Sequence, residues 1–129
     1  MVLHHIMIQV LEADLDEIVA FYLAALAPLG YEESMRFGTA VGFSADNKVH
    51  TDFWVMGQSV KPNTVAHIAF GGTRAQVDAF HAEALKAGAK DNGGPGIREH
   101  YHPTYYGAFV FDPAGNNIEV VSFQDDGPK

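Results

Sequence analysis

The chain has 129 residues, of which 47% are hydrophobic, a size and composition typical of a single globular domain. Lysine and arginine total 8 against 16 aspartate and glutamate residues, and this net charge of −8 argues against nucleic acids and anionic membranes as partners. The chain contains no cysteine, which excludes disulfides, thiolate metal ligands and cysteine nucleophiles.

Neither a membrane span nor a targeting segment is expected. The longest apolar run, residues 18–29, is well short of the roughly 20 residues that cross a bilayer. No basic segment leads into an apolar stretch and a cleavage site at the beginning of the chain. We therefore expect a cytoplasmic protein whose partners are small molecules or proteins.

The first half of the chain predicts a strand, a helix and then further strands. Residues 3–10 alternate, with Ile6, Ile8 and Val10 on one face and His5 on the other. An N-cap with a capping-box partner is predicted at Asp14 and Glu17, followed by an apolar stripe at Leu15, Ile18, Val19, Tyr22 and Leu26. Strand-like segments follow at residues 31–37, 39–44 and 50–56, and a connector at 57–63.

The second half repeats this pattern. Residues 64–70 alternate as a strand, and Thr73 with Gln76 forms a second capping box before an apolar helix that ends near Gly88. Glycine-rich residues 93–96 are interpreted as a flexible turn, because they lack the lysine and the following helix of a phosphate loop. Two strands close the repeat, at residues 106–111 and 117–123, with a turn at 112–116 between them.

The two halves also carry equivalent chemistry. His5 precedes Ile6 in the first strand, and His67 precedes Ile68 in the corresponding strand 62 residues later. Each half therefore predicts strand, helix and then two or three strands, with a histidine at the start of its first strand.

Four stretches of the sequence carry a family resemblance: LHHIMIQV, LDEIVAFYLAALAPLGY, VAHIAF and YYGAFVFDPAGNNIEVV. In these stretches the chain resembles the vicinal oxygen chelate superfamily, which includes glyoxalase I, extradiol dioxygenases and bleomycin-resistance proteins. The resemblance implies an α+β fold in which two βαβββ modules form an open, cupped mixed sheet with the helices on the outside. The modules are expected at about 1–57 and 64–125, within a single domain that spans 1–129.

The same resemblance implies metal ligands at His5, His67 and Glu119. Independently, Glu119 is the one carboxylate in an otherwise apolar strand, where its burial is costly unless it is paired or coordinated. Two histidines and a carboxylate are a ligand set that leaves open positions on a divalent metal, here iron, zinc, nickel or manganese.

Residues 98–106, REHYHPTYY, are dense in aromatic and titratable side chains and predict a pocket wall or lid. Acid–base and hydrogen-donor roles are expected among His100, His102, Tyr105 and Tyr106. We expect the substrate pocket to be lined by Trp54, Tyr101 and Arg98.

The resemblance leaves the reaction open between two enzyme types. Glyoxalase I-like members use a fourth ligand, a glutamate, near the end of the first module, where this chain offers Trp54 or Asp52 instead. Extradiol dioxygenases use only two histidines and a glutamate, but they carry a tyrosine where this chain has Phe109.

The leading hypothesis is a metal-dependent lyase, isomerase or dioxygenase that chelates vicinal oxygens of a small substrate. The alternative is a non-catalytic binder, like the bleomycin-resistance members, that takes a cationic aromatic compound between its aromatic side chains. A retained fold without activity is a third possibility. The resemblance also implies a homodimer, with the site either within one chain or shared between two.

Overall fold

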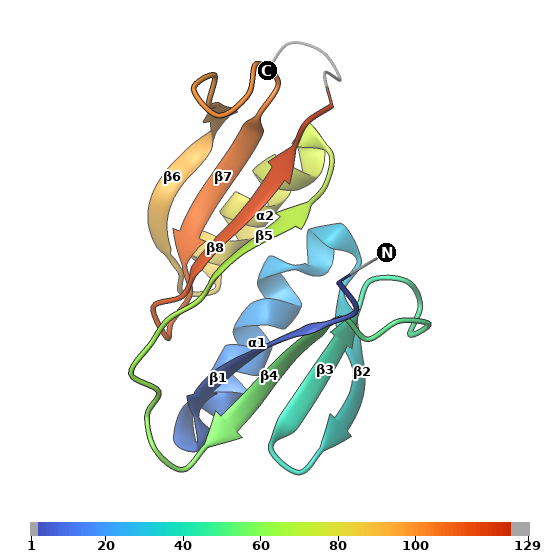
Figure 1. Ribbon diagram of the computed structural model, residues 1–129, viewed down its shortest axis with the longest axis vertical. Coiled ribbons are helices and arrows are strands. Elements are labelled where there is room, and N and C mark those ends of the chain that lie inside the picture. The colour runs from blue at the N-terminus through green and yellow to red at the C-terminus, as the bar shows by residue number, and fades with distance from the viewer. Residues whose placement is uncertain (1–2, 125–129) are drawn as a thin grey trace.

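Two βαβββ modules follow one another along the chain, which confirms the predicted fold class (Figure 1). The computed structural model describes residues 3–124. The first module consists of β1 (Ile6–Leu11), α1 (Leu15–Ala25), β2 (Glu32–Phe37), β3 (Ala40–Ser44) and β4 (Phe53–Gln58). Short 3-10 helices, η1 (Glu12–Asp14) and η2 (Ala27–Leu29), flank α1. The second module consists of β5 (His67–Gly71), α2 (Arg74–Lys86), β6 (Lys90–Ile97), β7 (Tyr106–Phe111) and β8 (Asn117–Ser122).

Each module forms its own mixed four-stranded sheet. The strand orders are β1-β4-β3-β2 and β5-β8-β7-β6. In both sheets the first strand pairs parallel with the last, and the remaining pairs are antiparallel. Figure 1 shows α1 behind the first sheet and α2 behind the second, so the opposite face of each sheet is left without a helix. Side chains on alternate positions of β1 and β5 project from these open faces.

The alternation seen in the sequence separates the core from the open faces. On β1, Ile8 and Val10 are buried, whereas Met7 and Gln9, which alternate with them, are exposed. The same pattern holds on β5, where Ile68 and Phe70 are buried. The helices α1 and α2 also pack against each other, so the two sheets share one continuous apolar core.

The two helix starts differ from each other. At α2 the predicted capping box is confirmed, because the Thr73 side chain accepts from the Gln76 backbone and the Gln76 side chain accepts from the Thr73 backbone. At α1 the predicted cap is wrong: Asp14 has helical φ and ψ angles and makes no side-chain cap bond, because η1 already begins the turn before it. None of the helices within residues 3–124 is long and apolar enough to cross a membrane.

The prediction of a flexible turn at residues 93–96 is wrong, because these residues belong to β6. The strand pairs with β7 through a ladder whose register shifts at Gly93 and again before Gly96. Gly93 has φ +144°, and a Cβ atom there would lie 2.9 Å from Nη2 of Arg98. The glycines therefore give the strand its irregular path and leave room for the guanidinium beside it.

A buried polar cluster joins the two modules. The Tyr22 hydroxyl, from α1, donates to the Asp112 carboxylate in the turn between β7 and β8. Asp112 is 4% exposed and also accepts from the Ala114 backbone, the Asn116 backbone and the Asn116 side chain at 2.8–2.9 Å. Burial raises the pKa of Tyr22, and the Asp112 charge raises it further, so the hydroxyl stays protonated and donates.

Candidate metal centre

Two of the three predicted ligands meet on the open face of the second sheet. His67 begins β5 and Glu119 lies in the middle of β8, the strand that pairs with β5. Nε2 of His67 is 3.0 Å from Oε1 of Glu119. The Glu119 residue is 3% exposed, whereas the His67 side chain is 52% exposed, so the pair has a buried carboxylate beneath an accessible imidazole.

The second ring nitrogen of His67 fixes which atoms of the pair face each other. Nδ1 lies 3.0 Å from the backbone carbonyl oxygen of Asn117, which is an acceptor, so Nδ1 carries a hydrogen and donates it. In the neutral imidazole, Nε2 then presents its lone pair to the Glu119 carboxylate. Either a proton or a cation between Nε2 and the carboxylate would make this contact favourable. Histidines that bind a metal through one ring nitrogen usually donate the hydrogen of the other to an acceptor such as a backbone carbonyl, as His67 does here. The residues present therefore fit a divalent metal.

Tyr105 completes the surroundings of Glu119. Its hydroxyl donates to Oε2 of Glu119 at 2.5 Å, so it contacts a different carboxylate oxygen from the one next to His67. Burial raises the pKa of Tyr105, and the hydrogen bond to Glu119 raises it further. The Tyr105 hydroxyl is therefore a donor to the carboxylate.

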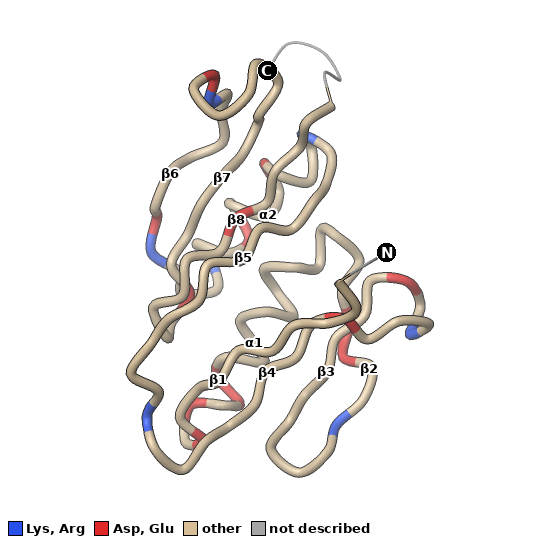
Figure 2. Tube along the Cα trace, in the orientation of Figure 1, with Lys and Arg blue, Asp and Glu red and all other residues tan. Residues whose placement is uncertain are grey.

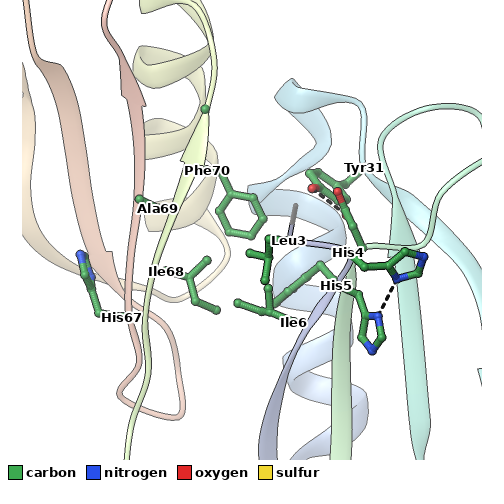
Figure 3. A pocket seen from close by; sticks show the side chains of 12 residues that line it. Leu3, His4, His5, Ile6, Tyr31, His67, Ile68, Ala69 and Phe70 are labelled. Atoms are coloured by element: carbon green, nitrogen blue, oxygen red, sulfur yellow. Dashed lines mark hydrogen bonds between the residues drawn. The ribbon is translucent and has the colours of Figure 1, made fainter. Parts of the chain in front are cut away.

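His5 does not join this pair within one chain. A groove of about 370 Å³ separates β1 from β5 and is bordered by both His5 and His67. Figure 3 shows the two imidazole rings pointing to opposite sides, with Leu3, Ile68 and Phe70 between them. Among residues 3–124 no group of three or more His, Cys, Asp or Glu side chains is placed to hold a metal ion.

The sheet registers identify the position in module one that matches Glu119. His5 lies two residues before Met7, which pairs with Trp54, and His67 lies two residues before Ala69, which pairs with Glu119. Trp54 therefore occupies in module one the place that the carboxylate occupies in module two. The other candidate for this place, Asp52, lies before β4 and accepts from the Tyr31 hydroxyl at 3.0 Å.

The open face of the first sheet is apolar around Trp54. The strands β1, β3 and β4 carry no charged residue (Figure 2). A hollow of about 510 Å³ lies on this face and is bordered by His5, Met7, Phe37 and Trp54. The Trp54 ring lies over Gly42, where a Cβ atom would be 3.0 Å from two ring carbons, and it stacks on Phe37 with centroids 6.2 Å apart. We call this region the Trp54 hollow.

The aromatic segment lies mostly on an exposed loop near Glu119. Tyr101 packs against His100 and Tyr105, with ring centroids 4.1 and 5.0 Å apart. The His102 ring stacks on Phe123, and its Nδ1 lies 3.1 Å from the Thr104 hydroxyl. These rings form one cluster around the side chain that contacts Glu119.

Two other residues of the segment take positions with a structural role. Tyr106 begins β7 on the face that packs on α2, and its hydroxyl donates to Asp78 at 2.5 Å. The Arg98 guanidinium donates to the backbone carbonyls of Gly94, Gly96 and Gly107 at 2.8–3.1 Å and lies over the Phe109 ring. Arg98 therefore holds β6 and β7 together at the base of the loop.

Paired βαβββ modules with a histidine at the start of each first strand and a glutamate on the last strand define a protein of the vicinal oxygen chelate class. The family model for the Glyoxalase/Bleomycin resistance protein/Dioxygenase superfamily matches residues 2–120. The chain therefore belongs to this superfamily. None of the curated protein sequences compared with the chain matches it.

Solved structures share this fold over nearly the whole chain. A glyoxalase/bleomycin resistance protein from Albidiferax ferrireducens T118 is 26% identical, with a TM-score of 0.78, and the match covers 92% of this chain and 96% of that one. A glyoxalase/bleomycin resistance protein/dioxygenase family enzyme from Burkholderia phytofirmans PsJN is 20% identical, with a TM-score of 0.71 and coverage of 95% and 98%. A mutant of the fosfomycin resistance protein FosX from Listeria monocytogenes, in complex with Mn(II) and 1S,2S-dihydroxypropylphosphonic acid, is 21% identical, with a TM-score of 0.65 and coverage of 92% and 87%.

Proposed function

We propose that the protein is a metal-dependent enzyme whose site is shared between two copies of the chain. His67 and Glu119 of one copy and His5 of the other would hold one divalent ion of iron, zinc, nickel or manganese. The observation that carries this proposal is the His67–Glu119 pair, in which Nε2 of an exposed imidazole lies 3.0 Å from a buried carboxylate oxygen. The substrate is a small molecule that offers two neighbouring oxygens.

The separation of His5 from the pair supports a shared site. His5 and His67 hold equivalent places in the two modules, but their rings diverge across the groove between β1 and β5 (Figure 3). A two-fold dimer that sets module one of each chain against module two of the other brings each His5 to a His67–Glu119 pair. Such a dimer has two identical sites and leaves the Trp54 hollow beside each of them.

A divalent metal supplies Lewis-acid polarisation of the substrate oxygens when it is bound. The chain itself supplies the remaining groups. Tyr105 holds the carboxylate, and His100 and His102 lie on the exposed loop next to it, where they are the candidates for acid–base roles. This set suits an isomerase, lyase or dioxygenase acting on a substrate with vicinal oxygens.

A heterodimer test separates a shared site from a site within one chain. We expect the His5→Ala and Glu119→Ala variants, each alone, to lose metal. Co-expressed with different tags and purified as a heterodimer, they should hold one metal per dimer, because one of the two shared sites regains all of its ligands. Elemental analysis by mass spectrometry measures the ratio against two per dimer for the wild type.

A matched heterodimer is the control. His67→Ala with Glu119→Ala should hold no metal, since both changes fall in the same half of the site and neither shared site is complete. A metal-free His5→Ala/Glu119→Ala heterodimer, alongside a loaded wild type, would contradict the shared site. A metal-free wild type after reconstitution with each of the four ions would contradict the metal centre altogether.

The Trp54 hollow favours a second candidate function, metal-independent binding of a planar aromatic cation. The lining of the hollow combines the aromatic rings of Trp54 and Phe37 with polar side chains that include Lys48 and His50, the chain carries a net charge of −8, and Trp54 is its single tryptophan. If this function is correct, N-methylquinolinium should quench Trp54 emission saturably, and EDTA should not change the affinity. Calorimetry should show about 10-fold weaker binding to Trp54→Ala, as expected for the loss of a desolvated cation–π contact. Quenching of Trp54 emission that rises linearly with N-methylquinolinium concentration and does not saturate would contradict this second function.

A further inference from the structure

Glu119 has two oxygens with two different partners. Oε1 lies 3.0 Å from Nε2 of His67, on the side of the open face. Oε2 accepts from the Tyr105 hydroxyl at 2.5 Å. Only Oε1 therefore faces the position where a metal could be bound by both His67 and Glu119.

The backbone around Tyr105 is built to hold its ring against Glu119. Gly107 lies beneath the ring, and a Cβ atom there would be 3.2 Å from Cε1 of Tyr105 and 3.7 Å from Oε2 of Glu119. The backbone of Tyr105 is bonded at both of its groups, with its carbonyl accepting from Arg98 at 2.8 Å and its amide donating to His102 at 3.0 Å. The ring also packs against Phe123, with centroids 5.3 Å apart.

We infer that Tyr105 is a positioning residue that makes Glu119 a one-oxygen ligand. By occupying Oε2, the hydroxyl fixes the rotation of the carboxylate and leaves Oε1 directed at the metal position next to His67. This inference rests on the proposed metal centre. It assigns to Tyr105 a role that acts through Glu119, not through contact with the substrate.

Three properties of the arrangement support this role. The hydroxyl donates to Oε2 at 2.5 Å, and Oε2 is the oxygen that faces away from His67. The carboxylate is buried, so water does not compete well for Oε2. Partners of this kind, one bond removed from the metal, typically change metal affinity by about 10- to 100-fold when they are lost.

The test is metal binding by the purified full-length protein, compared between Tyr105→Phe and the wild type. Isothermal titration calorimetry with Mn(II) should give an affinity about 10- to 100-fold weaker for Tyr105→Phe than for the wild type. The protein loaded with Co(II) should show a changed visible absorption spectrum, because the freed carboxylate rotates and binds through both oxygens. Far-UV circular dichroism checks that the variant is folded.

Tyr101→Phe is the matched control, because Tyr101 packs on the same ring but makes no contact with Glu119 that the described structure shows. It should bind Mn(II) like the wild type. Equal affinity and equal Co(II) spectra for Tyr105→Phe and the wild type would overturn the inference while the metal centre stands. An equal loss in Tyr101→Phe would also overturn it, since packing of the loop would then explain both. A wild type that binds neither Mn(II) nor Co(II) would remove the metal centre on which the inference rests.

Discussion

Replacement of Asp112 by alanine is expected to lower the free energy of unfolding by about 3–5 kcal/mol. The carboxylate is the common acceptor for the Tyr22 hydroxyl, two backbone amides and the Asn116 side chain. Alanine leaves these donors unpaired, and that of Tyr22 is fully buried. Because the cluster joins α1 to the turn before β8, its loss weakens the contact between the modules as well as the turn.

Urea denaturation followed by circular dichroism measures this change at one fixed protein concentration, since association contributes to apparent stability. Tyr22→Phe is the graded control: it removes a single donor and should cost about 1 kcal/mol. A loss below about 1 kcal/mol in Asp112→Ala would show that water replaces the carboxylate and that the cluster is not a structural link.

The change Glu119→Gln is expected to abolish stoichiometric metal uptake while leaving the free energy of unfolding within about 1 kcal/mol of the wild-type value. The amide keeps the shape of the side chain and still accepts from the Tyr105 hydroxyl. Its NH₂ group also donates to Nε2 of His67, whose lone pair faces this position. The metal loses a charged ligand, whereas the metal-free fold loses none of its hydrogen bonds.

Elemental analysis and urea denaturation on the same preparation test both halves of this expectation. Glu99→Gln, in the exposed loop, is the control and should retain wild-type metal content. Full metal content in Glu119→Gln would remove Glu119 from the ligand set. Metal loss together with a large loss of stability would mean instead that the carboxylate acts in the fold.

The repeat and most elements were predictable because their signals are local. The alternation around Ile8 and the capping box at Thr73 each depend on a few neighbouring residues, and both are confirmed. Strand β6 was missed because its glycines and proline are typical of turns. It becomes a strand through pairing with β7 and through the Arg98 guanidinium that fills the space beside Gly93, and neither contact is visible in a local pattern.

The site was predictable by residue type but not by its partners. The sequence placed His67 in the first strand and Glu119 in the last strand of module two, and the structure brings this pair together. The sequence could not show that the Asn117 carbonyl orients His67, because every residue has a backbone carbonyl and only the folded structure shows which one lies next to the imidazole. The pairing of Tyr22 with Asp112 was hidden for a related reason, since Tyr22 fits the apolar stripe of α1 and the residues are 90 positions apart.

Trp54 and Glu119 hold equivalent positions in the two modules but have different chemistry. A symmetric chain would have a carboxylate at both places and would surround a shared cation with four protein ligands. With an indole at Trp54, the proposed centre would have one protein ligand fewer, at the position that borders the Trp54 hollow. In the proposed centre, module two would contribute the negative charge that binds the cation, and module one would contribute the surface next to it that contacts the substrate. Replacing the indole of Trp54 by a carboxylate would add a fourth protein ligand to the proposed centre. The metal would then be bound more tightly, but the aromatic surface that contacts the substrate would be lost.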